Sequence, residues 1–164
     1  EVADIVEDLL VAARAAGGNL SVHPVPIDLS AVACGTLEIL GEEFSCDKPA
    51  GVTALADPAR LRQVIRNLAT NAIRHGGKQR RVIIRTVEDQ AVVEVRDDGA
   101  PIPSSLQGTM FEAYERTRYL SKARPESVGL GLTVAKSLAI SMSGNLEYEH
   151  DGTESIFRLT LPIG

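Results

Sequence analysis

Apolar residues recur with a helical period in three stretches of this chain. In the second stretch, the apolar residues between positions 61 and 72 fall on one face, which predicts a helix that buries this face against a sheet. Asp57-Pro58 is a favourable start for this helix, because aspartate can cap it and proline fits its first turn. A fourth helix is expected to begin at Asp28 or Ser30, either of which can cap it. The predicted helices span about residues 1–16, 28–40, 57–75 and 131–142.

Alternating and β-branched runs predict strands between these helices. The four most regular runs form two hairpins, one turning at Glu88-Asp89-Gln90 and one at Asp151-Gly152. We expect helices on one face of a mixed, mostly antiparallel sheet, because each apolar helix face needs a sheet to cover it. The fold class is therefore α/β, a two-layer sandwich of a five-stranded sheet and three helices. The predicted strands are residues 19–25, two short strands within 44–56, and 81–87, 91–96, 145–149 and 155–161.

Composition narrows the class of protein. A chain of 164 residues can form one domain with a hydrophobic core. Its net charge of −5 gives no reason to expect a nucleic-acid partner. No apolar run approaches the roughly 20 residues of a membrane span. Cys34 and Cys46 lack metal-ligand spacing, so we expect reduced, partly buried thiols in a cytoplasmic domain. Because the chain starts without methionine, we interpret it as a fragment whose parent could be membrane-bound.

Two amides on the predicted helix 57–75 are the first candidate for chemistry. Asn67 and Asn71 are four residues apart, so they lie on the same side of the helix and can converge on one ligand. Arg74 follows on that side. An asparagine carbonyl is a hard, uncharged oxygen that suits Mg²⁺ beside an anionic ligand. The pair alone is a weak signal, because exposed amides are common.

Two later segments strengthen this signal. Residues 97–103 place Asp97-Asp98-Gly99 after an apolar strand, and residues 127–132 place Gly129 and Gly131 before a helix. Main-chain N–H groups at a helix start stabilise phosphate oxygens. With the Asn pair and residues 110–116, these segments resemble the N box, the two Gly boxes and the F box of the ATP-binding domain of sensor histidine kinases. That domain belongs to the gyrase, heat-shock chaperone, histidine kinase and MutL ATPase superfamily, and the resemblance implies its Bergerat-type fold.

The resemblance implies roles for the residues of the N box. Asn71 would bind Mg²⁺, and Asn67 would lie near the triphosphate as a catalytic residue. Gyrase-like relatives have an acidic residue at the Asn67 position that activates water, and its absence fits a kinase. Arg74 would reach phosphate and His75 would line the nucleotide, although a solvated helix arginine and a surface histidine are alternative interpretations.

The resemblance also assigns the adenine and phosphate contacts. Asp97 would accept the exocyclic amine of adenine, and Gly99 would let the base approach the main chain. Pro101 stands where the family usually has glycine, and Ser127 replaces another glycine, which puts the mobility of both loops in question. The remaining nucleotide-binding assignments are Ile102, Phe111, Gly129, Leu130, Gly131 and Leu132.

A lid between the Gly boxes is expected to close over ATP. Phe111 would anchor it by apolar burial, although core packing is an equally physical explanation of this residue. Arg116 would be the catalytic cation that meets the γ-phosphate. This lid is expected to be mobile without nucleotide.

The predicted function is that of a histidine kinase catalytic domain that binds Mg-ATP. Residues 1–18 would be the end of a dimerisation-hairpin helix with its linker, and residues 19–164 the catalytic domain. The γ-phosphoryl group would pass to a histidine on the separate dimerisation domain of the same protein. A response regulator receiver domain and a homodimer of the full-length protein are the further partners implied. Two alternatives remain open: an anti-sigma-factor-type serine kinase, and a non-catalytic pseudokinase that binds partners.

Overall fold

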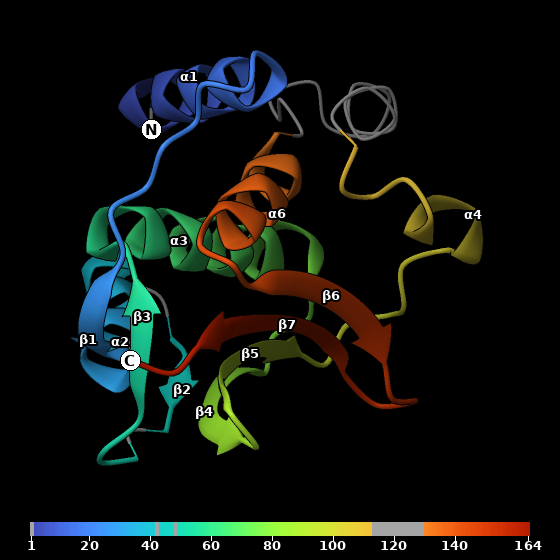
Figure 1. Cartoon of the computed structure of the whole chain (residues 1–164). Helices are drawn as coiled ribbons and strands as arrows, with labels where there is room; N and C mark the ends of the chain where they lie inside the picture. The colour runs from blue at the N-terminus through green and yellow to red at the C-terminus, as the bar shows by residue number, and fades with distance from the viewer. Residues whose placement is uncertain (1, 42, 48, 113–129) are drawn as a thin grey trace.

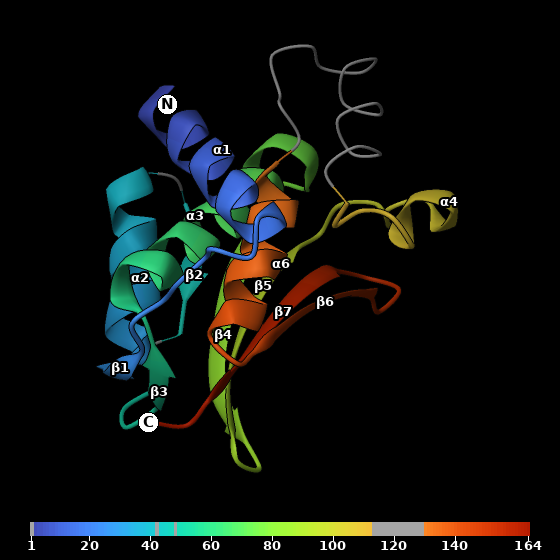
Figure 2. The same ribbon diagram turned by 45° about the horizontal axis from the view of Figure 1, so that its top comes forward.

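The computed structural model describes residues 2–41, 43–47, 49–112 and 130–164. A five-stranded sheet forms one layer, and α3 (Pro58–His75) and α6 (Gly131–Ser141) lie across one of its faces (Figures 1 and 2). α2 (Leu29–Leu40) packs beside α3, and α1 (Val2–Ala16) lies against α6 on the side away from the sheet. The expected two-layer α/β sandwich is therefore confirmed.

The sheet is mixed but mostly antiparallel, as predicted. Its order is β2-β4-β5-β7-β6, and only the β2–β4 pair is parallel among the described strands. The register places Asp97, the last residue of β5, beside Ser155, the first residue of β7. This pairing brings the end of the β4–β5 hairpin next to the first residue of β7 in the β6–β7 hairpin. The strands are β2 (Ser45–Cys46), β4 (Arg80–Val87), β5 (Gln90–Asp97), β6 (Asn145–His150) and β7 (Ser155–Pro162).

The core lies between α3, α6 and the sheet. Leu61, Ile65 and Leu68 of α3 are fully buried, which confirms the apolar face expected from their spacing. Leu138 of α6 and Leu159 of β7 are equally buried. The start of α3 also follows the sequence, because the Asp57 carboxylate accepts the main-chain N–H groups of residues 59 and 60. Burying a leucine side chain stabilises the folded state by about 1.5–3 kcal/mol, so this layer contributes much of the stability.

Two sequence expectations are wrong in the first third of the chain. The predicted strand 19–25 instead forms as β1 (Val25–Asp28), which includes Pro26 and pairs with β3 (Thr53–Ala56) in a separate two-stranded sheet. Proline is tolerated there because both strands are edges, and an edge strand does not need every N–H in a ladder. Pro26 therefore lies within the strand and does not end it.

The second correction concerns the cysteines. Cys34 of α2 and Cys46 of β2 form a disulfide, whereas we expected reduced thiols. Their Cα atoms are 5.9 Å apart, within the range that a disulfide spans. The 12-residue spacing of the two cysteines does not reveal this distance, because it depends on where α2 and β2 lie in the fold. The disulfide links the middle of α2 to edge strand β2.

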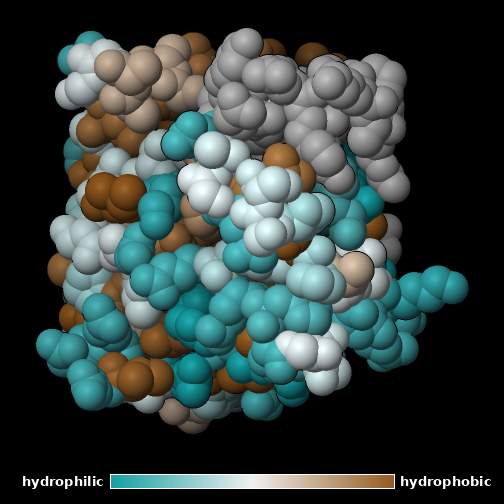
Figure 3. Space-filling model, turned by 90° about the vertical axis from the view of Figure 1, so that its right-hand side faces the viewer, coloured by the Kyte–Doolittle hydropathy of each residue, from teal (hydrophilic) through white to brown (hydrophobic). Residues whose placement is uncertain are grey.

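The surface is mostly polar on the side of α4 (Ser104–Gln107). Figure 3 shows small, separate hydrophobic areas there among a largely hydrophilic surface. Along the part of the chain that the structure describes, no helix has both the length and the apolarity that crossing a membrane requires.

Candidate nucleotide-binding site

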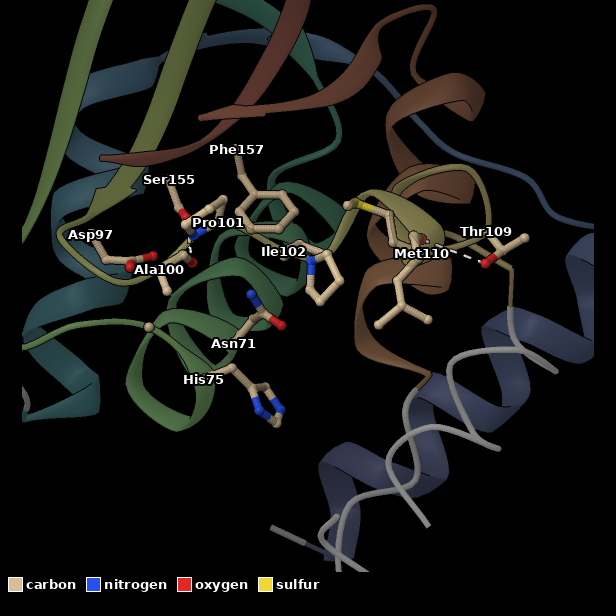
Figure 4. A pocket seen from close by; sticks show the side chains of 13 residues that line it. Asn71, His75, Asp97, Ala100, Pro101, Ile102, Thr109, Met110, Ser155 and Phe157 are labelled. Carbon is tan, nitrogen blue, oxygen red and sulfur yellow. Dashed lines mark hydrogen bonds between the residues drawn. The ribbon is translucent and has the colours of Figure 1, made fainter. Parts of the chain in front are cut away.

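A pocket of about 250 Å³ opens between α3, the segment after β5, and the start of β7. Figure 4 shows Asn71 and His75 of α3 on one side, Phe157 of β7 opposite, and Asp97 at one end. Polar side chains of α3, β5 and β7 thus converge on a cavity that apolar residues also line, and such a combination is usual in a small-molecule site. The lining residues are Asn71, His75, Gly76, Asp97, Ala100, Pro101, Ile102, Pro103, Leu106, Thr109, Met110, Ser155 and Phe157.

Asp97 is held rigidly at its end of the pocket. The side chain is only 3% exposed, and its Oδ1 accepts the N–H of Gly77 at 3.0 Å and that of Gly99 at 2.8 Å. A carboxylate offers about four acceptor positions, so these contacts leave Oδ2 the capacity to accept an amine from a ligand. Its neighbour Asp98 is exposed, does not line the pocket, and accepts the N–H of Gln79.

Close packing explains the glycines around Asp97. A Cβ at Gly76 would lie 2.5 Å from the Asp97 Cγ, and one at Gly99 would lie 2.7 Å from the Asp97 Oδ1. A Cβ at Gly77 would lie 2.6 Å from the Gly99 nitrogen. Two glycines directly after the predicted helix 57–75 indicate only a helix end, so the sequence analysis missed this contact. The signal was the occurrence of a second glycine, which ending the helix does not require.

The N box residues divide between pocket and core. Asn71 and His75 are one helical turn apart and both line the pocket, whereas Arg74 is exposed and does not. Asn67 also does not line the pocket. It is 7% exposed, and its Nδ2 donates to the main-chain oxygen of Gly131 at 3.1 Å. Asn67 therefore joins α3 to the first residue of α6.

A carboxylate from α1 reaches the same amide. Asp8 Oδ1 accepts from Gln63 Nε2 at 2.9 Å and more weakly from Asn67 Nδ2 at 3.5 Å. Arg66 forms an ion pair with this carboxylate at 3.5 Å. Burial raises the pKa of Asp8, while the hydrogen bond from Gln63 and the charge of Arg66 act in the opposite direction. The first helix is thus attached to the N box by polar contacts, and its Val11 side chain is buried in the core.

The family comparison agrees with this geometry. A family model described as "Histidine kinase-, DNA gyrase B-, and HSP90-like ATPase" matches residues 56–164, which contain every pocket residue. The chain belongs to this ATPase family.

Similar curated proteins are sensor kinases. The signal transduction histidine-protein kinase AfsQ2 of Streptomyces coelicolor is 31% identical over 163 residues, which cover 97% of this chain and 30% of AfsQ2. The circadian input-output histidine kinase CikA of Synechococcus elongatus is 28% identical over 172 residues, which cover 97% of this chain and 23% of CikA. The chain thus spans less than a third of the length of either relative. In such kinases, the matched domain is the catalytic, ATP-binding part.

Solved structures show the same fold. The Acinetobacter baumannii histidine kinase AdeS superposes with a TM-score of 0.76 at 21% identity, covering 97% of this chain and 77% of that one. The catalytic domain of the histidine kinase ThkA superposes with a TM-score of 0.75 at 20% identity, and the match covers 86% of this chain and 96% of the ThkA domain. Full-length ShkA in complex with AMPPNP superposes with a TM-score of 0.79 at 22% identity, and the match covers 97% of this chain and 35% of ShkA.

Of the other residues assigned from the ATPase-family resemblance, some line the pocket, some lie outside it, and some fall outside the described residues. Ile102 lines the pocket, and Gly99 contributes its N–H to Asp97. Phe111 does not line it but packs edge-to-face on Phe157, which does. Leu132 is buried in the core, and Leu130 immediately precedes α6. Two of the assigned residues, Gly129 and Arg116, lie outside the described residues, as does most of the expected lid.

Several residues that line this pocket were not found from the sequence. Phe157 and Ser155 come from β7, more than fifty residues after Asp97, and only the β5–β7 register brings them together. Leu106 and Thr109 lie between Pro103 and Arg124, where the sequence pattern is less regular. Alternation along β7 could have identified Ser155 and Phe157 as residues on one face, but not the pocket that this face borders.

The donor set fits Mg²⁺ bound jointly with a nucleotide. Within the described residues, no group of three or more histidine, cysteine or acidic side chains could hold a metal ion. Mg²⁺ usually takes one or two protein ligands and completes its octahedron with phosphates and waters. A single amide oxygen from Asn71 in the pocket matches that requirement.

Proposed function

We propose that this chain binds Mg-ATP in the pocket beside Asp97 and donates the γ-phosphoryl group to a histidine on a separate dimerisation domain. The observation that carries the proposal is the convergence of Asp97, Asn71 and His75 on one cavity within the region that matches the ATPase family. A receiver domain of a response regulator would be the next acceptor, and the full-length protein would be a homodimer.

Each polar residue of the pocket has a chemical task in this proposal. Asp97 would accept the exocyclic amine of adenine, which selects adenine over guanine because guanine presents an oxygen at that position. Asn71 would supply an oxygen to Mg²⁺, which neutralises charge on the phosphates when bound. His75 would line the nucleotide on the solvent side of α3, where its side chain is exposed. Transfer of the phosphoryl group then depends on positioning and on charge stabilisation.

The acceptor histidine would lie outside this chain. None of His23, His75 and His150 stands in the family's acceptor context, a histidine followed by an acidic residue and then an Arg-x-Pro-Leu-like run. α1 would be the end of the helix that connects to the acceptor domain. Its contacts with Asn67 and Gln63 through Asp8 support this role, because they attach the helix directly to the N box.

The test is a transfer assay with two polypeptides. This chain and the separate dimerisation domain of its parent are incubated with γ-labelled ATP and Mg²⁺. We expect label on the dimerisation domain, in an acid-labile and base-stable form that identifies phosphohistidine, and none on this chain. Acid-stable label on serine would support a serine kinase instead, and nucleotide binding without transfer would support a pseudokinase. Asp97→Asn is the negative control.

A further inference from the structure

The segment that forms one wall of the pocket has little hydrogen-bonding capacity of its own. Pro101 and Pro103 have no amide hydrogen, so Ile102 carries the only main-chain N–H of residues 101–103. Ala100 to Pro103 all line the pocket. The position of this wall therefore depends on which group accepts this N–H and which groups donate to the neighbouring main-chain oxygens.

Tyr148 and His150 of β6 are two of these groups, and Gln107, which donates to the main-chain oxygen of Ile102, is another. Tyr148 Oη accepts the N–H of Ile102 at 2.9 Å, and His150 Nε2 lies 3.1 Å from the main-chain oxygen of Gly99. The N–H of Gly152 donates to His150 Nδ1 at 3.1 Å. Since Nδ1 is then the acceptor, Nε2 carries the hydrogen and donates it to Gly99. The two residues are two apart on the strand, so both side chains project from the same face of β6.

Tyr148 also supports the opposite wall. Its ring packs against Phe157 with centroids 5.0 Å apart, and Phe157 lines the pocket. Its hydroxyl lies 3.3 Å from Ser155 Oγ, which in turn lies 3.5 Å from the main-chain oxygen of Ala100. Tyr148 itself does not line the pocket. It therefore contacts two walls of the pocket without being available to a ligand.

We propose that Tyr148 and His150 are positioning residues that hold residues 99–102 against the end of β6 and so shape the base side of the nucleotide pocket. The inference rests on the proposed function, because it takes Asp97 as the contact to the base. These β6 contacts lie on the same segment as Asp97 and Gly99, next to the expected adenine. Loss of these contacts should thus lower the binding affinity for every adenine nucleotide by the same factor, whatever its number of phosphates.

The experiment measures nucleotide affinity and local opening in the same variants of this chain. Tyr148→Phe keeps the ring and removes the acceptor of the Ile102 N–H. We expect its dissociation constants for ATP and ADP to rise by the same factor, about three- to tenfold, as for one lost hydrogen bond. The Ile102 amide should exchange faster in the nucleotide-free variant than in the unsubstituted chain. Circular dichroism checks that each variant is folded.

Three further variants separate positioning from general destabilisation. Glu149→Gln alters the intervening residue of β6, whose side chain pairs with Arg158, and should bind ATP within about twofold of the unsubstituted chain. His150→Gln keeps an N–H donor for Gly99 and should retain more affinity than His150→Leu, which fills a similar space but has no donor. This rescue would not be expected if the histidine acted only by filling space.

The outcomes distinguish this inference from the proposed function. An unsubstituted chain that does not bind ATP would overturn the proposed function. An unsubstituted chain that binds ATP, with Tyr148→Phe binding equally well, would overturn only the positioning role. A loss confined to ATP and absent with ADP would also overturn it, because the contact would then act on the γ-phosphate and not on the base side.

Discussion

The amide of Asn67 donates a hydrogen bond to the main-chain oxygen of Gly131, and the two atoms are 3.1 Å apart. This bond joins the middle of α3 to the start of α6, so the two ATPase-family segments that carry Asn67 and Gly131 form one structural unit. Asn67 is nearly buried and lies outside the pocket lining. Its position here supports the architecture of the site and does not by itself require contact with the nucleotide.

Replacing Asn67 with alanine should therefore destabilise the fold. The Gly131 oxygen would lose the donor from Asn67, and the loss of one such hydrogen bond costs about 0.5–1.5 kcal/mol of unfolding free energy. Urea unfolding followed by circular dichroism measures this quantity. Arg62→Ala on the same helix is the matched control, because Arg62 is exposed and should change stability by less than about 0.5 kcal/mol. Equal stability of the two variants would contradict the structural role of Asn67.

Gly76→Ala should disturb Asp97 directly. The added methyl carbon would lie 2.5 Å from the Asp97 Cγ and 2.6 Å from the Ala72 oxygen, so the carboxylate would have to move. We expect a loss of about 1–3 kcal/mol in stability together with weaker ATP binding. Gly35→Ala within α2 is the control: its Cβ would meet no atom within 4 Å, and alanine there should stabilise the helix by about 0.5–1 kcal/mol. Unchanged ATP affinity in a folded Gly76→Ala variant would show that Asp97 tolerates the displacement.

The sequence predicted what local rules control. The Asp57 cap, the apolar face of α3 and the β4–β5 and β6–β7 hairpins each depend on neighbouring residues, and all are present. It failed where contacts join distant segments. The Cys34–Cys46 disulfide joins α2 to β2, and Asp97 meets Gly77 because the end of β5 pairs with the start of β4, which follows the end of α3. The same limit applies to β1, whose register is set by pairing with β3 and not by its single proline, Pro26.

The disulfide should contribute measurably to stability. It closes a loop between residues 12 apart, and a loop of this size corresponds to about 3 kcal/mol from restriction of the unfolded chain. Dithiothreitol should therefore lower the unfolding free energy of the native chain. It should have no effect on the double variant Cys34→Ser/Cys46→Ser, which serves as the control. Detection of two free thiols in the folded, air-oxidised protein would contradict the disulfide.

Asn71→Ala tests the metal ligand. Without the amide oxygen, Mg²⁺ would lose its ligand from α3 and keep only phosphates and waters. We expect ATP to bind the variant with little or none of the gain that Mg²⁺ gives the unsubstituted chain. Calorimetric titrations with Mg²⁺ and with a chelator measure that gain in both proteins. The same Mg²⁺-dependent gain in both would show that Asn71 does not bind the metal.

Asp97 carries the central claim, that this pocket binds the adenine of ATP. Asp97→Asn would replace a charged acceptor with an amide, and losing a charge-assisted hydrogen bond costs about 1.5–3 kcal/mol, or roughly ten- to a hundredfold in affinity. Asp98→Asn is the control, because this neighbouring carboxylate is exposed and outside the pocket.

The most direct measurement is calorimetric titration of ATP with Mg²⁺ into the unsubstituted chain, Asp97→Asn and Asp98→Asn, each verified as folded. The account predicts that the unsubstituted chain and Asp98→Asn bind with similar affinity, and that Asp97→Asn binds at least about tenfold more weakly. ATP binding by folded Asp97→Asn with the affinity of the unsubstituted chain would contradict it.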